Sequence, residues 1–585
     1  MRKRLTTILI TSLIMVLALG GVCFFVYRQN KKLQNAQKEL KQQELDIFLD
    51  NSEKQVFDER QITVTSLDTK PKKAKTIYSR SYTEAKNAYI KKCKKKNLYD
   101  FDSPLMEWNL YGTNNLSMYL YFKASEDTYI RYTIQVEDDR IPNFTRTLYN
   151  GEANNLTREH EYQITGFVPG MKNLLILDMY GKDDKLRNQK VFEINVPALQ
   201  SGAETKLSVS SGRSEEQVSN GLYTVFGQHS ILLYDNSGVL RGEIPYNHVS
   251  SQKLLIEENK MYYGIDANHV VAIGPLGQVE KVYTLGKYSQ YEDFIYNGYG
   301  DLWILATEKG KKSKSVKDTV ISLNLQNGDI KELFSMETLL PKMMKTAKKT
   351  KKQKELNWID LNSLTQVNSD EILVSSRELS SIFKVININS RSPRITFIIG
   401  ESKVWKGSGY EKKLLAKAGQ AEANQAQADA QANSLVDLGS AAEVFYAPFG
   451  QTCIQQESSD KLSDGQYYLY VWNSNYGYSA TRPKVKWTGF KGVGTKQREA
   501  KCSYVEKYLI DETAAQYSQE ENKQVAYTPK NGSMQFYGTQ SIYNFGSAKE
   551  YAEYDKKGKL IRKFSHSIPN VSNVEKQDFK GFWFQ

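Results

Sequence analysis

The stretch Ser230-Ile-Leu-Leu-Tyr-Asp-Asn-Ser-Gly238 carries the pattern that decides the fold of most of the chain. A short apolar strand runs into a turn of Asp, Asn, Ser and Gly. The unit recurs as Val270-Val-Ala-Ile-Gly-Pro-Leu-Gly277, Val320-Ile-Ser-Leu-Asn-Leu-Gln-Asn-Gly328, Ile382-Phe-Lys-Val-Ile-Asn387 and Tyr551-Ala-Glu-Tyr-Asp-Lys-Lys-Gly558. Spacings of roughly 40 to 65 residues, lengthened by insertions, are typical of four-stranded propeller blades. We therefore predict a six-bladed β-propeller over residues 205–585.

The composition favours a large, mostly β protein. With 585 residues, 40% hydrophobic and 12% aromatic, the chain can bury a large core and should hold more than one domain. This composition excludes intrinsic disorder for most of the chain. The 38 Tyr, 37 Gly and 13 Pro suit many short strands better than a helical bundle. The predicted fold class is all-β.

Residues 85–199 show the alternation of a half-buried sheet. In Tyr129-Ile-Arg-Tyr-Thr-Ile-Gln-Val136, apolar residues at every second position face one way and polar residues face the other. Similar runs occur at Leu116–Lys123, His160–Phe167 and Asn173–Met179, between turn signals. We interpret this region as an immunoglobulin-like β-sandwich that precedes the propeller.

The N-terminal segment is predicted to contact the membrane. Leu5 to Tyr27 is an almost uninterrupted apolar run of about 23 residues, long enough to cross a bilayer. We expect residues 1–27 to form an uncleaved transmembrane helix, with a cleaved signal peptide as the alternative. Basic residues flank both ends of the run, so charge alone does not fix its orientation.

Residues 28–84 are predicted to form a helical stalk and linker. Leu33, Ala36, Leu40 and Leu45 are spaced as one loose helical stripe. The stripe contains fewer than about four clean heptads, so a single helix is the main reading, and homo-oligomerisation through a coiled coil is the alternative.

Two insertions interrupt the propeller pattern. Residues Lys342 to Lys354 include seven lysines with no aromatic residue between them, which is typical of a solvated loop and not of a nucleic-acid site. Lys412 to Asn433 is rich in Ala and Gln and is predicted to be a helical excursion from the rim. A scaffold role in the cell envelope would use these insertions to contact a partner protein.

The sequence predicts no metal site and no disulfide framework. The five histidines lie far apart without the spacing of zinc ligands. Of the four cysteines, Cys453 and Cys502 are the pair that one bridge could join.

Several segments of the propeller region resemble the bacterial arylsulfate sulfotransferases. Trp358-Ile-Asp-Leu-Asn-Ser363 is similar to the family's Trp-x-His-x-Asn-Ser stretch, and a Ser-Ser-Arg strand ending at Arg377 follows, as in the family. The segment from Tyr291 to Trp303 is similar to the family's His-Asp-Ile segment with its Asn-Gly turn. Phe449-Gly-Gln-Thr452 and Leu469-Tyr-Val-Trp-Asn473 resemble its Gln-His strand and the turn after it. The resemblance covers residues 85–585.

The resemblance implies a propeller outside the cytoplasmic membrane that moves a sulfuryl group from a phenolic sulfate ester to a phenol acceptor. No nucleotide donor or other cofactor is implied. In that family a histidine on the Gln-His strand becomes transiently sulfated, with other histidines and an arginine around it. The expected location is the cell membrane, with a single pass and an extracytoplasmic body.

The chain departs from the family at the histidine positions. The nucleophilic histidine falls on Thr452, the histidine of the Trp-x-His stretch on Asp360, and the third on Tyr291 or Glu292, while Arg377 is retained. Arg377 could still bind sulfate through paired hydrogen bonds. Thr452 is a poor replacement nucleophile unless a base such as Asp360 reaches it. The candidate catalytic residues are therefore Arg377, Thr452, Asp360 and Glu292, and the candidate substrate-binding residues are Arg377, Asn362, Tyr291, Gln451 and Asn473.

Two functional hypotheses follow from these positions. The first is a sulfotransferase-type enzyme whose activity is weakened or lost. The second is a non-catalytic propeller that binds a sulfated or aromatic ligand. Both require Arg377, Asp360, Thr452 and Glu292 to meet at one cavity.

Overall fold

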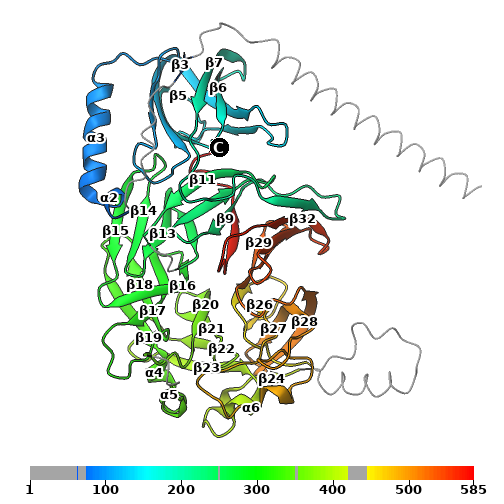
Figure 1. Ribbon diagram of the computed structural model, residues 1–585. Helices are drawn as coiled ribbons and strands as arrows, with labels where there is room; N and C mark the ends of the chain where they lie inside the picture. Colours follow the sequence, from blue (N-terminus) through cyan, green and yellow to red (C-terminus); the bar gives the residue numbers. More distant parts are fainter. Residues whose placement is uncertain (1–61, 64–73, 248–250, 350–353, 419–444) are drawn as a thin grey trace, which may run out of the picture. The chain divides into compact units, whose positions relative to one another are not determined.

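The computed structural model describes residues 62–63, 74–247, 251–349, 354–418 and 445–585 (Figure 1). The chain divides into two units, Met1–Ile62 and Thr63–Gln585, and the second contains nearly all described residues. The predicted membrane anchor and most of the predicted stalk lie outside the described residues. Within the described ranges, no helix has the length and apolar character needed to span a bilayer.

Two helices open the described part of the second unit: α2 (Ala74–Ile77) and α3 (Arg80–Lys94). Ser79 caps α3, because its side chain accepts a hydrogen bond from the Tyr82 N–H at 3.3 Å. Ile90 and Cys93 bury one face of α3 in a small apolar cluster with Tyr119 and Tyr121. The helix therefore rests on the first sheet.

The first sheet is organised around one long strand, β3 (Ser117–Val136). Its first half pairs with β2 and β5 and its second half with β4 and β6. The other strands are β1 (Ile62–Thr63), β2 (Leu105–Trp108), β4 (Phe144–Thr147), β5 (Thr157–Thr165), β6 (Lys172–Gly181) and β7 (Leu186–Asn195). Ile130, Tyr132 and Ile134 are at most 1% exposed, which confirms the predicted alternation.

Six further sheets of four or five strands follow. The first contains β9 (Leu222–Phe226), β10 (Ser230–Tyr234), β11 (Leu240–Pro245) and β33 (Val574–Gln577). The second contains β12 (Leu254–Glu257), β13 (Lys260–Asp266), β14 (His269–Ile273) and β15 (Val279–Thr284). The third contains β16 (Tyr288–Tyr296), β17 (Asp301–Glu308), β18 (Thr319–Asn324) and β19 (Ile330–Ser335).

The remaining three sheets continue the same order of strands. The fourth contains β20 (Leu361–Asn368), β21 (Glu371–Ser376), β22 (Ser381–Ile386) and β23 (Arg394–Gly400). The fifth contains β24 (Ala416–Lys417), β25 (Cys453–Glu457), β26 (Gln466–Asn473), β27 (Ser503–Asp511) and β28 (Gln516–Val525). The sixth contains β8 (Ser208–Ser211), β29 (Gly532–Tyr537), β30 (Gln540–Phe545), β31 (Glu550–Tyr554) and β32 (Leu560–Ser565).

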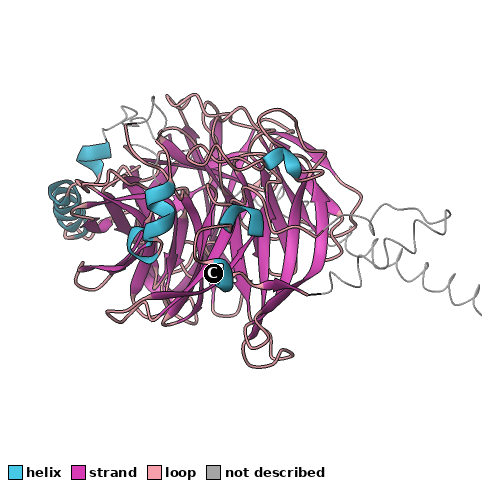
Figure 2. Cartoon of the chain, turned by 90° about the horizontal axis from the view of Figure 1, so that it is seen from below, coloured by secondary structure: helices cyan, strands magenta, loops and turns pink. Residues whose placement is uncertain are grey.

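The six sheets form a closed series through their edge strands. β12 meets β16, β16 meets β20, β20 meets β25, β25 meets β29, and β29 meets β33. Lys253, just before β12, forms an ion pair with Glu575 on β33, which links the second sheet to the first. The described chain is therefore all-β apart from a few helices (Figure 2), and its six sheets have a propeller-like arrangement (Figure 1).

The apolar strands of these sheets are buried on both faces. In β17, Leu302 to Ala306 are all buried. Ile304 packs in one apolar cluster, toward the second sheet, while Trp303 and Leu305 pack in another, toward the fourth. Because each sheet lies between two others, its central strands read as continuous apolar runs without polar alternation.

One buried arginine ties the first sheet of the series to the seven-stranded sheet. Arg241 on β11 is fully buried and pairs with Asp235 at 2.7 Å. Its other guanidinium nitrogens donate to the carbonyl oxygens of Gly166 at 3.1 Å and Pro142 at 2.8 Å. The charge is thus paired and its donors are satisfied, as a buried guanidinium requires.

The two predicted insertions are only partly described. The first contains α5 (Pro341–Thr346), preceded by α4 (Met336–Leu339), and residues 350–353 lie outside the described part. The second follows α6 (Ser402–Trp405) and contains η1 (Glu411–Lys413) and β24, before residues 419–444, which are also outside it. A further single turn, η2 (Trp487–Gly489), lies between β26 and β27.

The structure answers the question about a disulfide bridge. Cys93, Cys453 and Cys502 take part in no disulfide among the described residues. The bridge that could have joined Cys453 and Cys502 is therefore absent from the described chain.

Candidate functional site

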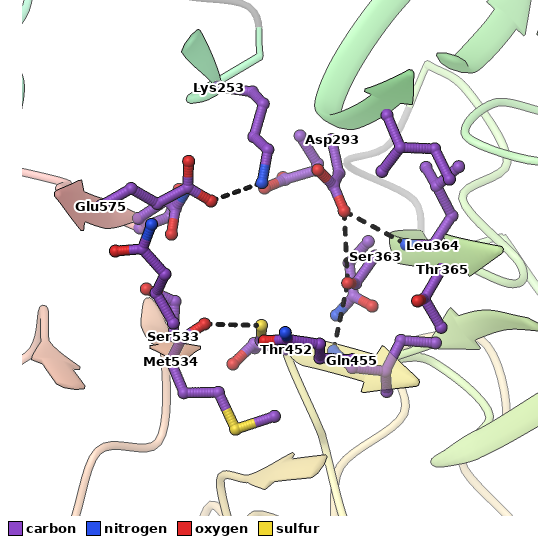
Figure 3. A pocket seen from close by; sticks show the side chains of 18 of the residues that line it. Lys253, Asp293, Ser363, Leu364, Thr365, Thr452, Gln455, Ser533, Met534 and Glu575 are labelled. Atoms are coloured by element: carbon purple, nitrogen blue, oxygen red, sulfur yellow. Dashed lines mark hydrogen bonds and ion pairs between the residues drawn. The ribbon is translucent and has the colours of Figure 1, made fainter. Parts of the chain in front are cut away.

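A cavity of about 440 Å³ lies where the edge strands of the six sheets meet (Figure 3). Each sheet contributes to its wall, and most of the contributors lie on or directly beside β12, β16, β20, β25, β29 and β33. Residues from distant parts of the sequence face one another here. Lys253 and Glu575, for example, are 322 positions apart and form an ion pair.

All four candidate catalytic residues line this one cavity. Arg377 directly follows β21, Thr452 directly precedes β25, Asp360 directly precedes β20, and Glu292 lies within β16. Asn362, a candidate for substrate binding, also lines it. Motifs that are far apart in the sequence therefore correctly marked positions that the fold brings together.

The other three candidates for substrate binding do not line the cavity. Tyr291 is 9% exposed and packs in the apolar cluster beneath the wall. The Gln451 amide donates to the carbonyl oxygens of Ser376 and Ser381. Asn473 donates to the Glu506 carboxylate at 3.1 Å. The contacts of these three residues lie within the surrounding sheets and loops, so they support the wall and do not line the cavity.

A lysine joins two of the candidate residues. Lys317 Nζ lies 3.2 Å from Glu292 Oε1 and 3.3 Å from Asp360 Oδ1. Burial lowers the pKa of Lys317, but the two carboxylates outweigh burial and raise it above its ordinary value. Lys317 is therefore an ammonium ion at neutral pH, and it neutralises much of the charge of Asp360 and Glu292.

All three members of this cluster have left-handed backbone conformations. The φ angles are 53° at Glu292, 56° at Lys317 and 51° at Asp360. Residues other than glycine adopt this conformation at a cost, and such residues concentrate at functional sites. The cluster is thus held in place by the surrounding sheets against local backbone preference.

Arg377 is a cation without a carboxylate partner among the described residues. Its Nη2 donates to the Pro529 carbonyl oxygen at 3.1 Å, and its guanidinium lies 6.0 Å from the centre of the Tyr476 ring. Its backbone N–H donates to the Asp360 carbonyl oxygen at 3.1 Å, which fixes the position of the residue. The remaining guanidinium donors are available to a tetrahedral oxyanion.

Thr452 is not arranged as an activated nucleophile. Its hydroxyl donates to the Gly532 carbonyl oxygen at 2.5 Å. The Asp360 carboxylate instead accepts from Asn357 at 2.8 Å and pairs with Lys317. The hypothesis that Asp360 serves as the base for Thr452 therefore has no hydrogen bond to support it in the described chain.

No described histidine lines the cavity. His160 is buried in the first sheet, between Thr128 and Tyr162, where burial lowers its pKa to about 4. His269, the first residue of β14, pairs with Asp266, and His248 lies outside the described residues. Among the described residues no cluster of His, Cys, Asp and Glu has the arrangement of a metal site.

A second charged cluster on the cavity wall was not predicted from the sequence. The Asp293 carboxylate accepts from the Leu364 N–H at 3.2 Å and from the Ser363 hydroxyl at 3.3 Å (Figure 3). Burial raises the pKa of Asp293 to about 6, although Lys253 opposes the shift. Asp293 follows Glu292 in a segment that the resemblance already marked, whereas no motif marks Lys253 or Glu575.

Cys453, which also lines the cavity, is unsuited to nucleophilic attack. Burial raises the pKa of its thiol to about 12, and the thiol donates to the Met534 carbonyl oxygen at 3.6 Å. A thiol with this pKa carries almost no thiolate at neutral pH.

The charges of the cavity leave one place for an anion. Lys317 is paired with Asp360 and Glu292, and Lys253 is paired with Glu575. Arg377 makes no such ion pair in the described part of the chain. A monoanionic ligand is therefore expected to place its charge at Arg377.

Comparisons with solved structures give only weak likenesses. BamB from Moraxella catarrhalis is 9% identical, covers 64% of this chain and 97% of its own, and has a TM-score of 0.29. The WD40 domain of Toxoplasma gondii coronin is 9% identical, covers 63% of this chain and 76% of its own, and also has a TM-score of 0.29. These scores are too low to carry an argument.

Comparisons with sequences point to a family. No curated protein matches the chain significantly. The family model described as "Arylsulfotransferase (ASST)" matches residues 208–579. That match covers more than half of the chain and includes the motifs around Arg377 and Thr452, so the chain belongs to the arylsulfotransferase (ASST) family.

Proposed function

We propose that the protein binds an aryl sulfate in the cavity, with the sulfate at Arg377, and transfers the sulfuryl group slowly to a phenol. Arg377 carries this proposal, because it is a cation without a carboxylate partner among the described residues of the cavity. Membership of the arylsulfotransferase family supports the choice of donor and acceptor.

The chemistry requires an anchor for the sulfate, a base for the acceptor and a proton for the departing phenolate. The Arg377 guanidinium holds the non-bridging sulfate oxygens. The carboxylates of Asp360 and Glu292 are the bases that the cavity offers. As the acceptor oxygen bonds to sulfur, the bond from sulfur to the donor oxygen breaks, and the acceptor's proton passes through a carboxylate to the phenolate.

The proposed activity is slow because these bases are weak. An ordinary carboxyl has a pKa near 4 and a phenol a pKa near 10, so a carboxylate removes the phenol proton unfavourably. Both carboxylates are also engaged in ion pairs with Lys317, which the acceptor's proton would have to displace. A histidine would be better matched to the task.

Binding and transfer are tested together. Titration calorimetry with 4-nitrophenyl sulfate should show binding that weakens at least tenfold in Arg377→Ala, since one charge-assisted pair is lost. Arg394→Ala, which removes an exposed arginine on β23, is the matched control. Release of 4-nitrophenol in the presence of a phenol acceptor measures transfer. Equal affinity in Arg377→Ala and wild type would disprove the anchor.

A second candidate function is ligand binding without transfer. The observation that favours it is the Thr452 hydroxyl, which donates to the Gly532 carbonyl oxygen and, in the described part of the chain, not to a carboxylate or a histidine. In a single-turnover experiment with excess protein, binding that depends on Arg377 without release of 4-nitrophenol would identify this function. Release within hours would instead support slow transfer.

We also propose an architecture for the whole chain. The six sheets are six blades of a propeller, the seven-stranded sheet is an immunoglobulin-like sandwich, and residues 1–27 anchor an extracytoplasmic body by one membrane pass. The closed series of edge strands supports the first point, and the apolar run supports the last. Protease treatment of intact spheroplasts should degrade the body, and full protection would contradict this orientation.

A further inference from the structure

A groove that shares no lining residue with the central cavity is lined by many lysines. It has a volume of about 490 Å³ and is formed by α5, the residues after α6 and the loop 481–485. We name it the lysine groove, defined by the six basic residues Lys342, Lys345, Lys348, Lys406, Arg482 and Lys484.

The lysine groove carries positive charge that no carboxylate lining neutralises. Its five lysines are exposed, and none makes an ion pair among the described residues. Beside the groove, the Glu411 carboxylate accepts a hydrogen bond from the Gly407 N–H at 2.6 Å. Glu378 is buried beneath the groove, and its carboxylate already accepts a hydrogen bond from the Thr481 N–H at 2.6 Å. The lysines therefore face solvent with their charge uncompensated.

The floor of the groove is preformed. Arg482 is 8% exposed, and its guanidinium donates to the carbonyl oxygens of Met343 at 2.8 Å and Trp358 at 2.9 Å. The Lys348 N–H donates to the Thr481 carbonyl oxygen at 2.8 Å. These bonds join α5 to the loop 481–485, so a ligand meets a wall that is already assembled.

We propose that the lysine groove binds a linear polyanion that carries phosphate groups along its length. Lysines are flexible point charges, and here they come from three separate segments, which suits repeated charges better than one small oxyanion. The Arg482 guanidinium, the group best suited to a single phosphate, already donates to protein carbonyls.

Other occupants fit the groove less well. No aromatic side chain lines the groove among the described residues, so no ring forms a platform for stacking the bases of a single-stranded nucleic acid. A lipid surface is flat, whereas this site is concave. The proposal is independent of sulfuryl transfer, because none of the six residues lines the central cavity.

The test measures binding of inorganic polyphosphate to the full chain in detergent. Lys342→Gln, Lys345→Gln and Lys348→Gln are combined in one variant. The matched control combines Lys556→Gln, Lys557→Gln and Lys559→Gln, in the turn between β31 and β32. We expect the groove variant to bind polyphosphate at least tenfold more weakly, while the control keeps the wild-type affinity. The slope of log K against log salt concentration should become shallower by about 2 in the groove variant, because fewer counterions are released. A second variant, Lys406→Gln with Lys484→Gln, should show a smaller loss.

Several results would overturn the proposal. Equal weakening in the groove and control variants would indicate unspecific attraction to the basic chain. Orthophosphate bound as tightly as polyphosphate would indicate a small-anion site, and tighter binding to phosphatidylglycerol vesicles or polyglutamate would identify a lipid surface or an acidic protein. The circular dichroism spectrum of the groove variant should match that of the wild type. If the spectra differ, the affinity of the Lys406→Gln, Lys484→Gln variant decides whether the groove binds polyphosphate.

Discussion

The carboxyl group of Asp293 makes the free energy of unfolding depend on pH. Burial raises its pKa to about 6 in the folded chain, above the unfolded value near 3.9. The folded state therefore holds this proton more tightly, so the free energy of unfolding falls as pH rises from about 4 to about 6. The effect is at most about 3 kcal/mol, because each pKa unit corresponds to about 1.4 kcal/mol and Asp293 is partly exposed.

The variant Asp293→Asn isolates this contribution. We expect its stability relative to wild type to increase as pH rises from 4 to 7, because the amide keeps an acceptor for Ser363 and Leu364 but cannot ionise. Urea unfolding at several pH values measures the difference. A difference that stays constant with pH would show that Asp293 titrates as an ordinary carboxyl.

The sequence identified some residues of the cavity and missed others for physical reasons. Arg377, Asp360, Thr452 and Glu292 belong to motifs that the resemblance aligned, and all four line the cavity. Lys317 belongs to no motif, and its role arises only because two segments distant in sequence each bring a carboxylate to its ammonium group. Long-range ion pairs leave no periodic pattern in a sequence, so a single chain cannot reveal them.

The strand β29 is fixed against β26 by a glycine. A Cβ atom at Gly532 would lie 1.9 Å from the indole nitrogen of Trp472, which is fully buried. We expect Gly532→Ala to lower the free energy of unfolding by about 1–3 kcal/mol or more, because the ring must move in a packed core. Gly489→Ala is the control, since no atom lies within 4 Å of its Cβ position. Urea denaturation compares the two, and equal midpoints would contradict the packing.

The contact between β11 and the seven-stranded sheet depends on Arg241. Replacing it with Met leaves Asp235 without its ion-pair partner and removes two hydrogen bonds to carbonyl oxygens in the loops that flank β4 and β5. We expect a loss of about 3–5 kcal/mol in the first unfolding transition. Arg158→Met, at a side chain 66% exposed, should change it by less than about 1 kcal/mol. A small effect of Arg241→Met would show that other contacts hold the two parts together.

The strands themselves were partly predictable. The runs Leu116–Lys123 and Tyr129–Val136 were predicted as separate strands, but both belong to the single 20-residue strand β3. The register shifts between Lys123 and Thr128, where β3 leaves one set of partners for another. Periodicity reports which residues face a core, but it does not report where one strand passes between two partners.

Folding of the whole molecule requires its last strand, β33, and the residues after it. β33 pairs with β9, and Phe579, Phe582, Trp583 and Phe584 pack in the apolar core shared with the seven-stranded sheet. We expect a chain truncated after residue 571 to aggregate instead of folding, because β9 would expose an unpaired edge and a large apolar surface. Gel filtration and thermal unfolding measure the outcome, with Lys580→Ala as the control. A soluble, cooperatively melting truncation would contradict it.

At this scale the repeat of strand and turn predicted an all-β, propeller-like chain. The repeat could not predict that strands from the two ends of this region pair within one sheet. β8 pairs with β32, and β9 pairs with β33. Such pairs join residues more than 300 positions apart, and the sequence pattern near Ser208 or Val574 is the same whether its partner is near or distant.

The pairing of β9 with β33 also affects the timing of biosynthesis. β9 emerges early but must wait while about 350 further residues are translated, which takes about 20–70 s at ordinary ribosome speeds. During that interval its edge is open, and a neighbouring nascent chain could pair with it. The ring of sheets can thus be completed only after translation has almost finished, which makes a holding chaperone useful until then.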